Sequence, residues 1–440
     1  MYHIKVNIPE RFIEEKKYVF DIISSFTGIG FAVGGRHEDY ELILPNGKNI
    51  VIRDSFFGEL GDKNTYLDPE LIPYSVKFLS CLHADDLPVI FGNDSFYENG
   101  NGVIIGADIV AGIFFMLSRW EEAVLTVKDD HGRFPGSDSY AVRHKLIRRP
   151  VVDEYVDFLV SVIRSLDPGV EIKDRESRVI ITSDIDSFEK FPSGKTLKMF
   201  AGHLLKRYDP LLFAADLYRY TVKLFGAKDP YDTFERIYSV AEKFGTKPVF
   251  FILAAPEGPY NDGWFARCAQ DAGVFHSLAE KGAGVGLHYG YFSLLSENNI
   301  KSEKFELEKK YGISAEKGRA HFLQFDVRSS YGILELSGIK EDFSMGYSRH
   351  AGFRCGTGRS FSPWDIDRKC AYDIKETPLV VMDTTLYAHN RMRKDQIRTE
   401  FEYFLRTAEK YGTDITLLIH NSSPAFVFEA LEETLKNKIR

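Results

Sequence analysis

Two closely spaced aspartates, Asp184 and Asp186, are the residues of this chain whose spacing points most directly to chemistry. They follow the apolar run Val179-Ile180-Ile181, and in an extended segment side chains two residues apart project to the same side. Two carboxylates held together repel each other unless a cation or a shared proton relieves the repulsion. The pair therefore predicts a metal site, with capping of the following helix by one aspartate as the structural alternative.

Three histidines, His288, His321 and His420, also stand in or directly after short β-rich runs. A zinc ion in a hydrolytic site typically takes about three protein ligands and a water. Asp186, His288 and His321 would supply one oxygen and two nitrogens, so we predict that they hold a divalent cation, with zinc as the expected ion. His420 leaves a fully apolar run, where it could protonate a leaving group, and Asp383 is predicted to orient a histidine.

An arginine set between glycines, Arg354 in GFRCG, is a further candidate, because its guanidinium can fix a carboxylate through two hydrogen bonds. Arg319 stands two residues before His321, so the guanidinium and the imidazole are expected to share a face. The structural alternatives are a surface loop for Arg354 and a core histidine bonded to the backbone for His321 or His420.

Seven short β-rich runs alternate with longer helical stretches in the second half of the chain: VIITSD, PVFFILA, AGVGLH, RAHFLQF, HAGFR, PLVVMD and ITLLIH. Parallel strands joined by crossover helices produce this alternation, so the sequence predicts an α/β fold, either a barrel or a doubly wound sheet. The carboxyl ends of parallel strands converge on one face. The aspartates and histidines, far apart in sequence, are therefore expected to be neighbours in space.

The chain is predicted to divide near residue 172, where a polar stretch carries Pro168 and Gly169. Residues 1–172 would form an N-terminal α+β domain and residues 173–440 a second domain. Within the first domain, the runs that flank PNG predict a β-hairpin, and residues 108–123 predict a buried helix. No chemical residues group there at a telling spacing, so a structural or substrate-shaping role is expected.

Charge and composition exclude several classes of function. Lys and Arg total 56 against 64 Asp and Glu, a net charge of −8 without a basic stripe, which argues against nucleic-acid binding. The longest apolar stretch, residues 109–117, is far shorter than the ~20 residues that span a bilayer. The charged N-terminus does not read as a signal peptide, and the four cysteines form no C-x-x-C pair. A cytoplasmic location is therefore expected.

The order of these motifs resembles the polysaccharide deacetylase family, also known as the NodB-homology or carbohydrate esterase family 4 group. The resemblance is carried by the D-x-D after the first strand, the later histidine, the Phe-Arg loop and the terminal L-x-x-H. It implies a distorted seven-stranded (β/α) barrel in which Asp184 is the general base, oriented by Arg354. It also implies that Asp186 and His288 are metal ligands and that His420 is the general acid.

The resemblance covers about residues 175–425 and departs from the family pattern at one position. The family usually has a second histidine four residues after the first, whereas Phe292 stands four residues after His288. His321, from the next predicted strand, would replace it. Two earlier segments, FFMLSRWEE and DHGRF, resemble the N-terminal domain of uncharacterised polysaccharide-deacetylase-like proteins in bacterial surface-glycan loci.

The implied function is metal-dependent removal of an acyl group, N-acetyl above all, from an amino sugar or surface-glycan precursor. One alternative is a catalytically inactive glycan-binding homologue, which the missing histidine would favour. A second is a phosphatase of the haloacid dehalogenase type, with Asp184 as nucleophile and Mg²⁺ as the ion, but it leaves the histidines without a role. The residues predicted to contact the sugar are Tyr289, Tyr291, Trp264 and Arg319.

Overall fold

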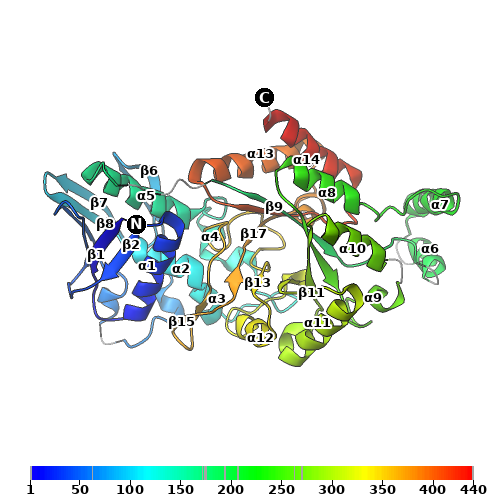
Figure 1. Ribbon diagram of the computed structural model, residues 1–440, viewed down its shortest axis with the longest axis horizontal. Helices are drawn as coiled ribbons and strands as arrows, with labels where there is room; N and C mark the ends of the chain where they lie inside the picture. The colour runs from blue at the N-terminus through cyan, green and yellow to red at the C-terminus, as the bar shows by residue number, and fades with distance from the viewer. Residues whose placement is uncertain are drawn as a thin grey trace.

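The computed structural model describes residues 2–61, 63–170, 172, 176–192, 195–205, 208–261, 263–268 and 271–438. Its two large β-sheets are built one before residue 110 and one after residue 178, with helices packed on each (Figure 1). The predicted domain boundary at residues 172–173 falls in a stretch of which 171 and 173–175 lie outside the described residues, and it stays a prediction.

The N-terminal sheet has six strands in the order β2-β1-β3-β4-β8-β7. The predicted hairpin is confirmed, because β3 and β4 pair antiparallel with Tyr40 opposite Ile52. A two-stranded antiparallel sheet, β5 and β6, lies beside it. The bounds are β1 (His3–Asn7), β2 (Gly30–Val33), β3 (Tyr40–Ile43), β4 (Asn49–Ile52), β5 (Lys77–Cys81), β6 (Ala84–Val89), β7 (Gly92–Asn99) and β8 (Gly102–Ala107).

Three helices, α1 (Ile13–Thr27), α2 (Ile109–Ser118) and α5 (Val151–Leu166), pack against one another next to this sheet. Every residue of α2 is buried, which agrees with the predicted buried helix. That helix ends where Arg119 adopts a positive φ of 53°, and α3 (Trp120–Val124) then starts in a new direction. Glu122 of α3 is bound by Arg119 at this break and by Arg354 from the second half of the chain.

The second sheet is a curled, half-barrel sheet of eight parallel strands in the order β16-β13-β12-β11-β10-β9-β18-β17. It is consistent with the predicted distorted barrel, although the described strands number eight rather than seven. The bounds are β9 (Val179–Ile185), β10 (Val249–Leu253), β11 (Gly284–Tyr289), β12 (Lys317–Ala320), β13 (Glu341–Asp342), β16 (Lys375–Glu376), β17 (Leu379–Met382) and β18 (Ile415–Leu418).

Helices cover the outer face of this sheet (Figure 1). All five residues of β10, VFFIL, are buried, as expected for a parallel strand that is enclosed on both faces. In α13 the residues Ile397, Phe401 and Phe404 recur at helical spacing and bury one face. The larger helices are α8 (Phe234–Lys243), α10 (Asp271–Glu280), α11 (Glu297–Tyr311), α12 (Ser330–Leu336), α13 (Lys394–Tyr411) and α14 (Ala425–Lys438).

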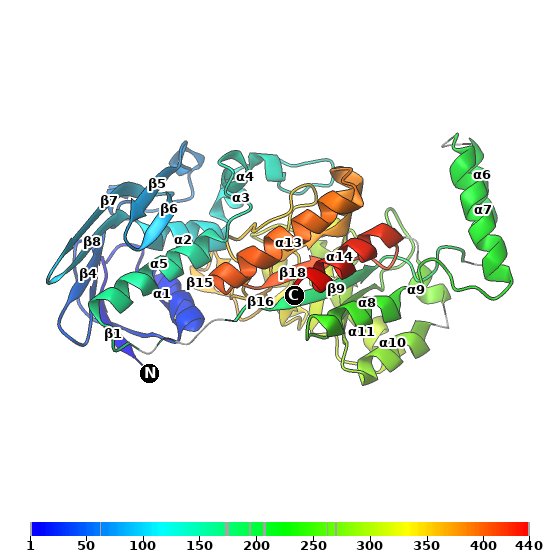
Figure 2. The same ribbon diagram turned by 90° about the horizontal axis from the view of Figure 1, so that it is seen from above.

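A helical hairpin, α6 (Thr196–Leu205) and α7 (Pro210–Leu224), projects from the body after β9 (Figure 2). Its apolar side chains Leu197 and Leu211 are largely exposed. Among the described helices, none combines the length with the apolar character that crossing a bilayer requires.

Candidate active site

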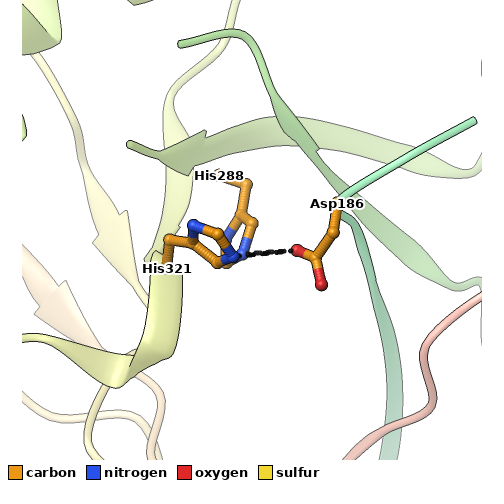
Figure 3. A group of neighbouring side chains, drawn as sticks. All are labelled: Asp186, His288 and His321. Carbon is orange, nitrogen blue, oxygen red and sulfur yellow. Dashed lines mark ion pairs between the residues drawn. The ribbon is translucent and has the colours of Figure 1, made fainter. Parts of the chain in front are cut away.

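Asp186, His288 and His321 converge at the carboxyl edge of the second sheet (Figure 3). Asp186 directly follows β9, His288 lies near the end of β11, and His321 directly follows β12. Oδ1 of Asp186 is 3.2 Å from Nε2 of His288 and 3.5 Å from Nε2 of His321. One ligand atom from each residue lies within 4.8 Å of the other two, which is the donor set and spacing of a three-ligand metal centre.

The second nitrogen of each imidazole is held by an oxygen, which fixes the orientation of the ring. Nδ1 of His288 lies 2.9 Å from the carbonyl oxygen of Arg319, so that an Nδ1–H donates there and the Nε2 lone pair faces Asp186. Nδ1 of His321 lies 3.3 Å from Oδ1 of Asn261 in the same manner. Metal-binding histidines are commonly oriented by such contacts.

The electrostatics of this cluster favour a positive charge at its centre. Burial opposes ionisation of Asp186, but the neighbouring imidazoles outweigh it and hold the pKa of Asp186 below its usual range. Burial likewise disfavours the charged form of His288, yet Asp184 and Asp186 raise its pKa. The pKa of His321 is lowered to about 4, mainly by burial, so this ligand is neutral at pH 7. Oδ1 of Asp186 is buried and receives no well-formed hydrogen bond from the described residues, so the donor set fits a divalent cation.

Asp184 is buried beside this cluster, and Arg319 fixes one of its carboxylate oxygens. Arg319 Nη1 donates to Oδ1 of Asp184 at 2.9 Å and also to the hydroxyl of Thr182, while Nε donates to the carbonyl of Phe343. The second oxygen of Asp184, Oδ2, lies 3.8 Å from Nε2 of His288 and faces the pocket. Oδ1 of Asp184 is thus fixed by Arg319, and Oδ2 is available to accept a proton.

His420 approaches the same point from the end of β18. Its Nδ1 is 2.7 Å from Oδ1 of Asp383, and its backbone N–H donates to Oδ2 of Asp383 at 2.7 Å. Burial lowers the pKa of His420, but Asp383, Asp186 and Asp184 raise it to about 10, so the imidazole carries a proton at neutral pH. Its Nε2 lies 4.0 Å from Oδ2 of Asp186. Asp383, predicted to orient a histidine, is therefore in contact with His420.

Arg354 does not reach Asp184, and this corrects the sequence prediction. Its guanidinium donates to both oxygens of Glu122, in the RWEE segment, and to the carbonyl of Gly346. The run HAGFR is a loop rather than a strand, and the loop turns Arg354 toward α3 instead of the pocket. Arg319 takes the predicted place of Arg354 beside Asp184.

Three residues predicted to contact a sugar have no free face. Tyr289 is fully buried and its hydroxyl donates to Asp342. Trp264 is 3% exposed and stacks on Phe188. Arg319 is fully buried, and its guanidinium makes the contacts described above. Tyr289 and Arg319 lie within the enclosed strands β11 and β12, and Trp264 begins the short helix α9 (Trp264–Arg267) with its ring packed inward, so residue type alone does not indicate a sugar contact.

Tyr291, also predicted to contact a sugar, belongs to an aromatic cluster at the edge of the pocket. Its ring lies 4.3 Å from that of Tyr260 and 5.5 Å from that of Phe322, and its hydroxyl contacts Nδ1 of His131 at 2.9 Å. Tyr260 and Phe322 are the exposed members, at 55% and 36%. They offer the apolar surface on which a sugar ring could stack.

A pocket of about 310 Å³ connects these groups. Asp184, Asp186, His288, His321 and His420 all line it. Arg133, Phe322 and His389 also line it, and the sequence analysis did not single them out. Arg133 lies in DHGRF, the segment that the resemblance had marked without a role. The signal was therefore in the sequence, but no spacing rule links residue 133 to a sheet that begins at residue 179.

Comparison with known proteins gives one family match and several solved structures, each covering part of the chain. The profile of a family of unknown function (DUF7033) matches residues 4–168. No curated protein matches the sequence. Among solved structures, a Mycobacterium smegmatis protein assigned as a polysaccharide deacetylase is 14% identical, with a TM-score of 0.39, over 60% of this chain and 86% of that chain.

Two further solved structures each align with 60% of this chain at 11% identity. A family 4 carbohydrate esterase from Streptomyces lividans, in complex with acetate, has a TM-score of 0.29 and is covered over 90% of its length. A carbohydrate esterase family 4 pseudoenzyme from Bacillus anthracis has a TM-score of 0.28 and is covered over 62%. Because these TM-scores lie below 0.5, we base the proposed function on the geometry of the site.

Proposed function

We propose that the protein is a metal-dependent hydrolase that removes an acyl group, N-acetyl above all, from an amino sugar or surface-glycan precursor. One observation carries the proposal. The Asp186–His288–His321 cluster, the half-anchored carboxylate of Asp184 and the protonated imidazole of His420 line a single pocket. A ligand set for a cation, a base and an acid are the three parts that metal-assisted amide or ester hydrolysis requires.

Asp186, His288 and His321 would hold a divalent cation, expected to be zinc, which would supply Lewis-acid chemistry towards a carbonyl and a water. Asp184 accepts the proton of the attacking water on Oδ2, because Arg319 holds Oδ1. The water oxygen bonds to the acyl carbon, and the bond from that carbon to the sugar nitrogen or oxygen breaks. His420 donates its proton to the departing group, while Asp383 keeps its Nε2 directed into the pocket.

Metal binding and its consequence for turnover test this proposal. Protein stripped with a chelator and dialysed against Zn²⁺ should retain one zinc ion, and it should release acetate from N-acetylchitooligosaccharides only in the zinc-loaded form. His288→Ala should weaken zinc binding by at least ~100-fold, since even loss of an outer partner costs about 10–100-fold. His276→Ala is the matched control, because His276 is exposed on α10 outside the pocket.

Two results would overturn the proposal: stripped protein that turns over at the zinc-loaded rate, or zinc binding that survives His288→Ala unchanged. Zinc binding without acetate release from any acetylated saccharide would favour the binding-only homologue. Phosphate release from a generic phosphoester that requires Mg²⁺ and Asp184 would favour the phosphatase.

A further inference from the structure

A second cavity, of about 830 Å³, opens beside the pocket that holds the metal-binding cluster. Arg133, Ser348 and His389 line both cavities, so the two cavities adjoin. The volume of the second cavity lies in the range of small-molecule binding sites. A ligand whose reacting group reaches His288 and Asp186 would therefore extend into this space, which we call the side groove.

One wall of the side groove comes from the N-terminal domain, residues 129–137. Gln324 donates to the carbonyl of His131 at 3.0 Å, and Arg133 donates to the carbonyl of Phe322. Gly136 packs so closely that a Cβ there would lie 2.7 Å from Cδ2 of His350. These contacts fix the wall against the loops of the second domain.

The side groove carries arginines whose charge the protein does not neutralise. Arg349 and Arg391 line it, are exposed, and form no ion pair with any described residue. By contrast, Arg133 pairs with Asp129 at 2.7 Å, and Arg354 pairs with Glu122. Asp130, an exposed carboxylate, also lines the groove, but the two unpaired guanidinium groups outnumber it. The recess therefore keeps a positive charge within a chain of net charge −8, which favours anions.

The histidines of the groove respond to this charge. Burial lowers the pKa of both His350 and His389, and Arg349 lowers both further. Both imidazoles line the groove, and because their pKa is lowered they are neutral there and can hydrogen-bond a ligand. The recess thus combines two arginines, which suit planar oxyanions such as carboxylate and phosphate, with two neutral hydrogen-bonding rings.

We propose that the side groove binds an oxyanion of the substrate, so that the hydrolase acts on an acetylated saccharide bearing a carboxylate or phosphate in preference to a neutral one. This inference rests on the proposed function for the reaction, but the binding itself does not. The oxyanion is either a uronate carboxylate of an acidic glycan or the phosphate of an activated sugar, and the recess offers the same chemistry to both.

Calorimetric titration of the full-length Asp184→Asn protein in the presence of chelator tests this, because neither catalysis nor metal contributes to the readout. Three probes are compared: a hyaluronan tetrasaccharide, which alternates glucuronate with N-acetylglucosamine, the neutral N-acetylchitotetraose, and inorganic pyrophosphate. The test variant adds Arg349→Ala and Arg391→Ala. The matched control adds Arg36→Ala and Arg406→Ala, two exposed arginines outside the groove.

We expect at least one anionic probe to bind about ten-fold or more tightly than the neutral one, with an affinity that falls as salt rises. Removal of Arg349 and Arg391 should reduce that affinity about ten-fold and leave the neutral probe unchanged. Preference for the tetrasaccharide identifies a carboxylate source, and preference for pyrophosphate a phosphate source. Equal binding of all probes, or the same loss in the matched control, would overturn the inference.

The outcome separates this inference from the proposed function. Absence of anion binding in a protein that binds zinc and releases acetate would contradict only the proposed role of the side groove. Anion binding that depends on Arg349 and Arg391, in a protein that binds no zinc, would support the role of the side groove and contradict the proposed hydrolase function.

Discussion

Two buried arginine–carboxylate pairs, Arg354–Glu122 and Arg319–Asp184, differ in how many carboxylate oxygens are used. Arg354 binds both oxygens of Glu122, and Arg119 donates to Oε1 as well at 2.9 Å. Arg319 binds only one oxygen of Asp184, and the other faces the pocket. The first pair is therefore saturated, and the second keeps one acceptor for a ligand or a proton.

This difference shows what separates a structural pair from a reactive one when both are buried. A buried carboxylate whose two oxygens are both bound by guanidinium groups is held and neutralised on both sides, so we expect it to contribute to stability. A carboxylate held on one side only is oriented and still reactive. The amino-acid types are the same in both places, so saturation of hydrogen bonds decides the role.

The largest effect in this comparison is expected when the charge of Asp184 is removed. The Asp184→Asn change should reduce acetate release from N-acetylchitooligosaccharides by up to ~10⁴-fold, because the general base is lost while the shape is kept. Zinc content should not change, since the ligands are untouched. Asp367→Asn, at an exposed position, is the control. Activity within about two-fold of wild type would assign the base to another group.

Loss of the saturated pair should act on stability instead. Arg354→Met leaves Glu122 buried without its main partner, and we expect the free energy of unfolding to fall by about 3–5 kcal/mol in urea denaturation followed by circular dichroism. Arg349→Met is the matched control, because Arg349 has no ion pair with a described residue, and it should change stability by less than ~0.5 kcal/mol. Equal effects at the two positions would contradict the distinction.

The smallest effect concerns pH. Burial raises the pKa of Glu122, but Arg354 and Arg119 outweigh it and lower the pKa from 4.5 to about 2. The unfolded chain therefore binds the proton first, so this stabilisation is complete above pH 4.5 and is lost as pH falls toward about 2. Its size is about 3 kcal/mol. Urea denaturation across this window should show a smaller acid-induced loss in Glu122→Gln than in wild type; an identical loss would refute the assignment.

Much of the second sheet was predictable because its strands are enclosed, and enclosed parallel strands are continuous apolar runs. PVFFILA, PLVVMD and ITLLIH contain β10, β17 and β18, and VIITSD and AGVGLH cover all but the last residue of β9 and β11. RAHFLQF supplies only the end of β12, because His321 begins a 3₁₀ turn in which Phe322 has a φ of 60°. β13 and β16 have two residues each, ED and KE, and their polar sequence gives no strand signal.

The cluster of Asp186, His288 and His321 could be predicted because strand ends converge, which is a property of topology alone. The partner of Asp184 could not, because Arg319 and Arg354 are equivalent by residue type and only the fold decides which one turns inward. Contacts between the two halves of the chain also could not be predicted from the sequence. Nothing local in DHGRF or RWEE reveals that Arg133 meets the pocket or that Glu122 meets Arg354.

The ion pair between Glu122 and Arg354 affects whether the two halves of the chain can fold independently. Arg148 pairs with Glu400 and Arg359 with Asp153 across the same junction. Removal of the N-terminal half would leave Arg354, Arg359 and Glu400 without these partners. It would also remove the wall of the recess that carries Arg133. The N-terminal half is thus an integral part of the folded protein rather than an exchangeable attachment.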